Sequence, residues 1–139
     1  MNKNVFTLII SYLMISMLSL SCSGSKTPAQ EEYTLLGDGG GFTGVETIYK
    51  VSDNGRIEKS GEYLGRLSKE EISQLRENKQ TLQLDQIEYL KPGNIYHLLE
   101  FNKGGVARKL VWDPYDPEHP KALELYYNHL FYLIKKHSK

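Results

Sequence analysis

Hydrophobic and polar positions alternate with period two in two separate stretches of this chain, and each stretch is followed by a helical pattern. Positions 45–51 alternate, and Asp53-Asn54-Gly55 then marks a tight turn, because Asn and Gly accept positive φ angles. Positions 95–101 alternate in the same way, and 102–105 supply the next turn. Strands are therefore predicted over 33–36, 45–51, 56–63, 95–101 and 106–112.

Two helices follow these hairpins. Ser68 and Glu71 form the pattern of a capping box, and the first helix is expected to end near Lys79. Asp116 is a candidate N-cap for the second helix, with Pro117 at its first position. Its apolar stripe consists of Leu123, Tyr126, Tyr127, Leu130, Leu133 and Ile134.

This order of elements predicts the fold class. It reads (β)ββαββα, with the first strand the least marked, which favours an α+β domain with an antiparallel sheet and two helices on one face. One such domain is expected over 33–139, a length that suits a single modest core.

The N-terminal segment has the pattern of an export signal. Lys3 precedes an apolar run of 16 residues, Val5–Leu20, which is shorter than the roughly 20 residues that span a bilayer. Cys22, the one cysteine of the chain, follows at once, so the segment resembles a bacterial lipoprotein signal. The alternatives are a plain secretory signal cut near Ser21 or Ser23 and a retained membrane helix.

The lipoprotein resemblance implies three regions. Residues 1–21 are the signal peptide, 22–32 are the lipidated Cys22 with a flexible tether, and 33–139 are the domain. Acylation with diacylglyceryl supplies two or three chains, and two chains anchor a protein stably where one does not. The expected location is the bacterial cell envelope, facing the periplasm, because no run of acidic residues follows Cys22.

Charge and composition exclude some partners. Without the signal, which carries only Lys3, the chain has 16 basic and 17 acidic residues and one net negative charge. Nucleic acid, which calls for a basic surface, is therefore not expected as a partner. No cysteine remains for a disulfide after Cys22, so the fold must rest on burial and hydrogen bonding.

Catalytic patterns are sparse in this sequence. The four histidines show no pair at metal-ligand spacing, and His97 is expected to be a hydrogen-bonded core residue. The acidic and histidine residues of 113–119 could bind calcium, but the prolines and a helix start explain the same residues. We therefore expect no metal site, no cofactor and no enzymatic activity.

A glycine-rich segment over 37–44 is the strongest functional candidate. It satisfies the G-x-G-x-x-G pattern, but a strand follows it where a dinucleotide site requires a helix. The bland interpretation is a wide hairpin loop whose glycines merely permit the turn. A further alternative is that Phe42 folds back onto the sheet as a core residue. The functional interpretation is a contact surface with Phe42 as its anchor. The expected partner-binding residues are Gly39, Gly40, Gly41, Phe42, Thr43 and Gly44.

Several of these features occur together in a known family. The segment Gly40–Gly44, a short helix with an acidic cap, the hairpin segment 95–99 and the closing amphipathic helix resemble the emfourin family over about 35–136. Emfourins are small proteinaceous inhibitors of thermolysin-like zinc metalloproteases. The resemblance implies a binding module that occludes the cleft of a secreted or envelope protease. The alternative is an envelope scaffold or assembly lipoprotein that uses its sheet and inhibits nothing.

Cys22 gives the first testable prediction. In the Cys22→Ala variant we expect release from the membrane or accumulation of an unprocessed precursor, because the acyl acceptor is lost. Fractionation and apparent mass on a gel measure both outcomes. A variant that stays in the membrane fraction at the mature size, as the parent does, contradicts the lipoprotein interpretation.

Overall fold

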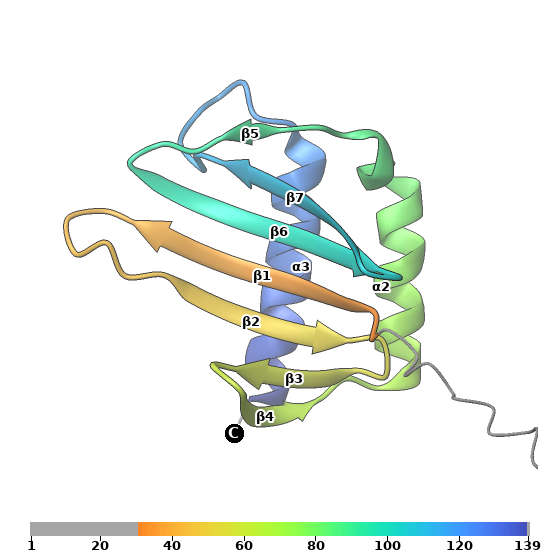
Figure 1. Ribbon diagram of the computed structural model, residues 1–139. Helices are drawn as coiled ribbons and strands as arrows, with labels where there is room; N and C mark the ends of the chain where they lie inside the picture. Colours follow the sequence, from red (N-terminus) through yellow and green to blue (C-terminus); the bar gives the residue numbers. More distant parts are fainter. Residues whose placement is uncertain (1–30, 139) are drawn as a thin grey trace, which may run out of the picture.

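In the computed structural model, residues 31–138 form one sheet of seven strands with two α-helices packed on one of its faces (Figure 1). The domain is α+β, as the order of predicted elements indicated. The predicted signal peptide, the lipidation site Cys22 and nearly all of the tether lie outside the described residues. The strands are β1 (Tyr33–Gly40), β2 (Thr47–Ser52), β3 (Arg56–Lys59), β4 (Glu62–Arg66), β5 (Leu90–Lys91), β6 (Ile95–Lys103) and β7 (Val106–Trp112), and the helices are α2 (Lys69–Thr81) and α3 (Lys121–His137).

The first strand, the least marked in the sequence, lies in the middle of the sheet. The strand order is β4-β3-β2-β1-β6-β7-β5, so β1 joins the two hairpins. It pairs antiparallel with β2 over Tyr33–Asp38 and with β6 over Tyr33–Gly40. Residues 37–40, which the sequence suggested as the beginning of a loop, are therefore strand.

The sheet departs from the prediction at both edges. The return strand expected over 56–63 is divided into β3 and β4, because Ser60 and Gly61 adopt positive φ angles of 52° and 81° and turn the chain. At the other edge β5 pairs parallel with β7, so the sheet is mixed rather than antiparallel throughout. The chain passes from α2 through a short 3₁₀ helix, Leu84–Gln86, to β5. Strand β5 then runs alongside β7 in the same direction (Figure 1).

The core lies between the sheet and α3. Leu36 at the centre of β1 is fully buried, as are Leu99 and Trp112 on β6 and β7. Every residue of the stripe expected in the last helix is buried, so the 3.6-residue period identified the core face correctly. Four aromatic pairs lie between the sheet and this helix, among them Phe101 with Tyr126 at 5.7 Å between ring centroids.

The two helices differ in how well the sequence predicted their beginnings. Ser68 caps α2 and Glu71 completes the capping box, as expected. In contrast, α3 begins at Lys121 rather than after Asp116, and it has no side-chain cap. Asp116 instead accepts a hydrogen bond from the Glu118 backbone N–H at 2.9 Å, and Pro120 disfavours helical backbone at the residue before it.

Glu71 connects the beginning of α2 to the end of α3. Its carboxylate accepts a hydrogen bond from the Ser68 backbone N–H at 2.8 Å and lies 2.8 Å from both Lys136 Nζ and His137 Nε2. Hydrogen bonds from these partners, His137 first, lower the pKa of Glu71 to about 2. The ionised form of Glu71 therefore stabilises the folded state.

Glu71 gives a prediction of pH dependence. Its pKa is lower in the folded state than its usual 4.5, so its contribution is present above pH 4.5 and is lost as the pH falls towards 2. Glu71→Gln should lower the free energy of unfolding by about 1 kcal/mol at pH 7, and the gap to the parent should close below pH 4.5. Urea unfolding at several pH values measures this gap.

The exposed neighbour Glu70 supplies the control for this measurement. Glu70→Gln removes the same charge from the first turn of α2 but breaks no ion pair formed within residues 31–138. It should change stability by less than about 0.5 kcal/mol. Equal effects of the two substitutions would show that the Glu71 ion pairs do not stabilise the domain.

Candidate functional site

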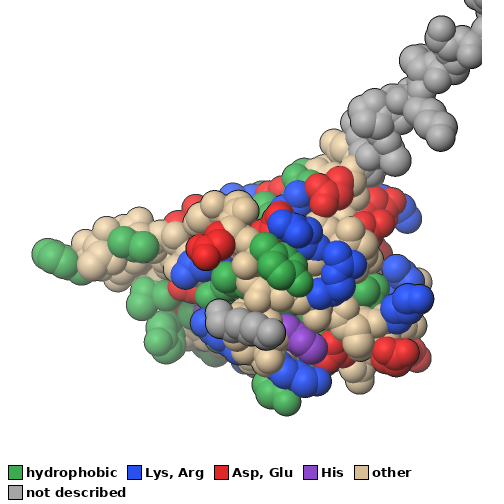
Figure 2. All heavy atoms as spheres, turned by 90° about the horizontal axis from the view of Figure 1, so that it is seen from below, with side chains coloured by type: hydrophobic (Ala, Val, Ile, Leu, Met, Phe, Trp, Pro, Cys, Tyr) green, Lys and Arg blue, Asp and Glu red, His purple; other side chains and the backbone are tan. Residues whose placement is uncertain are grey.

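The loop between β1 and β2, residues 41–46, projects beyond the ends of the neighbouring strands (Figure 1). Pairing of β1 with β2 ends at Asp38 and Thr47, whereas pairing of β1 with β6 continues to Gly40 and Ile95. Figure 2 shows hydrophobic side chains along the narrow end that this loop forms, at the left of the molecule. The loop is thus supported by β6 on one side and lies open on the other.

The glycines expected to bind a partner divide into two groups. Gly39 and Gly40 contact the chain's own β6: a Cβ atom on Gly39 would lie 2.7 Å from the Tyr96 hydroxyl oxygen, and one on Gly40 would lie 2.1 Å from the Asn94 carbonyl oxygen. The Gly41 backbone N–H donates a hydrogen bond to the same Asn94 carbonyl at 2.7 Å. These glycines hold the root of the loop against the sheet.

The remaining expected residues form the exposed part of the loop. Phe42 has a relative exposure of 107%, so it does not fold back onto the sheet, and the alternative of a core phenylalanine is wrong. Thr43 is exposed as well. Gly44 has a φ of 61°, and no atom lies within 4 Å of the position of an added Cβ. Its role is to turn the chain rather than to allow a close contact.

Two apolar residues that the sequence analysis did not single out accompany Phe42. Val45 in the loop is 65% exposed, and Ile95 at the beginning of β6 is 39% exposed. Ile95 pairs with Gly40, beyond the last β1–β2 pair. We call Phe42, Val45 and Ile95 the tip surface. Ile95 alternates in phase with the buried Leu99 and Phe101, but it lies at the end of the strand and is left exposed.

A hydrogen bond across the outer face of the sheet fixes the second half of the loop. The Tyr96 hydroxyl donates to the Glu46 carboxylate at 2.9 Å, and this bond together with burial raises the pKa of Tyr96. Glu46 lies directly before β2, so the two ends of the loop are held by Asn94, directly before β6, and by Tyr96 near the beginning of β6. A loop fixed at both ends loses less conformational entropy when it binds a partner.

A second cluster of ionisable groups lies under the sheet at the beginning of α3. Glu124 accepts hydrogen bonds from Trp112 at 3.0 Å and Asn128 at 3.1 Å, and its carboxylate lies 3.5 Å from His97 Nδ1. Burial acts to raise the pKa of Glu124, but the hydrogen bond from Trp112 and the electrostatic interaction with nearby His97 outweigh it, so the pKa is lowered.

His97 is partly buried as expected, but its buried Nδ1 has no hydrogen-bond partner within residues 31–138. It is held by stacking on Tyr127 at 4.1 Å between ring centroids.

The two aspartates of 113–119 accept hydrogen bonds from the backbone of their own turns. Asp113 accepts a hydrogen bond from the Tyr115 N–H at 2.8 Å, and Asp116 accepts one from Glu118. Within residues 31–138, no three His, Cys, Asp or Glu side chains are arranged to hold a metal ion.

Comparison with known proteins gives no match to this chain, neither from a family model nor from a curated protein. Neither helix of the described segment, residues 31–138, combines the length and the apolar character that crossing a membrane requires.

Two glycines of the loop supply a paired prediction. Gly40→Ala should lower the free energy of unfolding by about 2–4 kcal/mol, because a positive φ and a backbone collision coincide there. Gly44→Ala should cost only about 1 kcal/mol, because the space around it is empty. Urea unfolding compares the two. A Gly40→Ala variant as stable as Gly44→Ala would contradict the close contact with Asn94.

Proposed function

We propose that this protein is a bacterial lipoprotein, anchored through Cys22 in the cell envelope, whose domain acts as a binding module. Its tip surface inserts into an apolar cleft of a partner protein. The observation that carries this proposal is the complete exposure of Phe42 on a loop that Asn94 and Tyr96 hold at its two ends. An exposed aromatic on a preorganised loop is typical of the residues that dominate binding energy.

The distribution of apolar surface favours the tip over the open face of the sheet. An apolar row crosses that face from Ile48 through Leu98 and Val111 to Leu90. However, Leu98 and Val111 at the centre of the row are only 2% and 7% exposed, and Leu90, at the edge strand β5, is the strongly exposed member at 66%. The scaffold alternative, which needs this face, would therefore have to rely on the edge of the sheet rather than on its centre.

A thermolysin-like metalloprotease is the partner that we propose to test first. The resemblance of the loop and the closing helix to the emfourin family supports this choice. The aromatic side chain at the tip suits an apolar specificity pocket, and the narrow loop suits a cleft. In this proposal the chain performs no catalysis and inhibits by occupying the cleft.

Replacing Phe42 tests the anchor directly. Phe42→Ala should raise the Kd for the protease at least tenfold, because burying a phenylalanine contributes roughly 1.5–3 kcal/mol and 1.4 kcal/mol is a factor of ten. Its unfolding midpoint should equal that of the parent, because the side chain makes no core contact. Inhibition of peptide hydrolysis by thermolysin, titrated with each variant, gives the affinities.

Leu125→Ala is the matched control. Leu125 is 63% exposed on α3, so its loss removes exposed apolar surface away from the loop, and affinity should stay unchanged. A parent protein that neither binds nor inhibits thermolysin would contradict the protease proposal. Equal affinities of parent and Phe42→Ala would show that the tip surface is not the anchor.

A further inference from the structure

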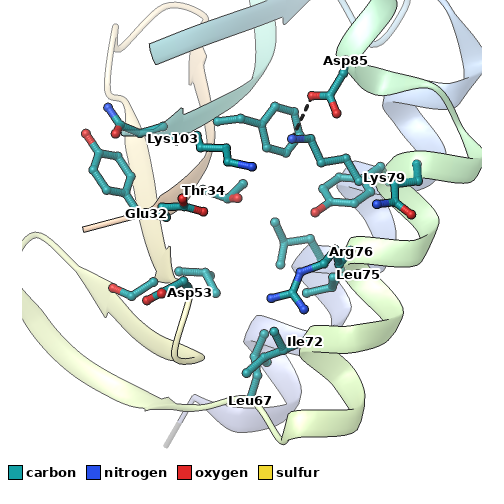
Figure 3. Close-up of a pocket in the computed structure, with 18 residues that line it drawn as sticks. Glu32, Thr34, Asp53, Leu67, Ile72, Leu75, Arg76, Lys79, Asp85 and Lys103 are labelled. Carbon is teal, nitrogen blue, oxygen red and sulfur yellow. Dashed lines mark ion pairs between the residues drawn. The ribbon is translucent and has the colours of Figure 1, made fainter. Parts of the chain in front are cut away.

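A cavity of about 260 Å³ lies at the opposite end of β1 from the tip surface (Figure 3). It opens between α2 and the adjacent ends of β1, β2 and β6. Its inner wall is apolar and comes from buried side chains of both layers, namely Val51, Leu75, Phe101, Tyr126 and Leu130. An engineered apolar cavity of about 150 Å³ holds a benzene molecule, so this one has room for a ring with a short polar extension.

Two side chains that carry hydroxyl groups line the cavity. Tyr126 is one of them and is only 4% exposed. Thr34 lies on the same side of the sheet, between Val51 and Phe101 in the register, and points into the cavity in Figure 3. A hydroxyl group can both donate and accept a hydrogen bond, so the wall offers polar contacts beside its apolar surface.

The rim of the cavity carries charges of both signs. Lys79 is already engaged, since its Nζ lies 2.8 Å from the Asp85 carboxylate and 4.3 Å from the centre of the Phe101 ring. Arg76 on α2 and Lys103 at the end of β6 form no ion pair within residues 31–138. Figure 3 shows both side chains directed towards the space between helix and sheet.

Two carboxylates at the rim, like Arg76 and Lys103, form no ion pair in the described part of the chain. Glu32 directly precedes β1 and Asp53 directly follows β2, and the Asp53 backbone N–H donates to the Glu32 carbonyl at 2.9 Å. The backbone therefore places these two acidic residues side by side. The rim thus offers two anionic groups from neighbouring chain segments, together with cations from α2 and β6.

From this arrangement we infer that the cavity binds a small zwitterion with an apolar side chain, such as a free hydrophobic amino acid. The carboxylate of the ligand pairs with Arg76 and Lys103, and its ammonium group pairs with Glu32 and Asp53. The apolar side chain lies against Phe101, where the wall excludes water. The inference is independent of the proposed protease partner, because the tip surface shares no residue with the cavity.

L-phenylalanine is the probe, titrated calorimetrically into the full chain in detergent. Saturable binding with a Kd near or below about 1 mM is expected, as is a rise of the unfolding midpoint with ligand concentration. Two matched compounds test the charges: 3-phenylpropionate lacks the ammonium group and 2-phenylethylamine lacks the carboxylate. Each should bind at least tenfold more weakly than L-phenylalanine.

The variant Arg76→Gln/Lys103→Gln should weaken binding of L-phenylalanine at least tenfold without changing the unfolding midpoint of the free protein, because both side chains are exposed. Lys109→Gln, an exposed lysine on β7 that does not line the cavity, is the control and should bind as the parent does. Absence of saturable binding would show a cavity filled by water alone. Equal affinities for the three compounds would also overturn the inference. So would a loss of affinity for L-phenylalanine in Lys109→Gln as large as that in Arg76→Gln/Lys103→Gln.

Discussion

Strand β1 is paired along both of its edges, with β2 over six residues and with β6 over eight. This pairing holds together two hairpins that are otherwise separate in the sequence, and it places Leu36 at the centre of the core. Gly39 and Gly40 pair with β6 alone, so β1 extends two residues beyond the point where its pairing with β2 stops. The loop that follows is therefore supported by Asn94 and Tyr96 at its root and is free to project from there.

Helix α2 is held mainly by polar contacts at its ends. Glu71 joins its first turn to the end of α3, and Asn78 contacts His129 at 3.0 Å near its last turn. Leu75 is its one buried residue and Ile72 is partly buried against the core, so the helix contributes a narrow apolar face. This mode of attachment leaves space between α2 and the strand ends, and the cavity with the Tyr126 hydroxyl occupies it.

Features that depend on a few neighbouring residues could be predicted from the sequence. The Asn54-Gly55 turn and the Ser68 capping box involve only local backbone geometry, and the stripe of α3 follows from the helical period. Contacts between distant segments could not be predicted. The parallel pairing of β5 depends on where α2 ends in space, and the beginning of α3 depends on whether Asp116 caps a helix or a turn.

The candidate site shows the same division. Glycine content identified the loop, but the sequence could not distinguish an exposed Phe42 from a core residue, because that depends on how far β1 extends beyond β2. Ile95 was missed for a related reason. The alternating pattern continues to the end of β6, but the elements that bury the rest of the strand do not extend that far. The cavity is formed by residues from several segments that are far apart in the sequence, so no single sequence pattern marks it.

The direction of β1 relates the two ends of the domain to the membrane in the proposed lipoprotein. The described chain enters the domain at residue 31, beside the cavity, and β1 then runs about 26 Å to the tip surface at roughly 3.3 Å per residue. A domain tethered through residues 22–32 thus carries the cavity near its point of attachment and the tip surface at the far end of the strand. Phe42 can then contact a partner at the end of the domain opposite to the tether.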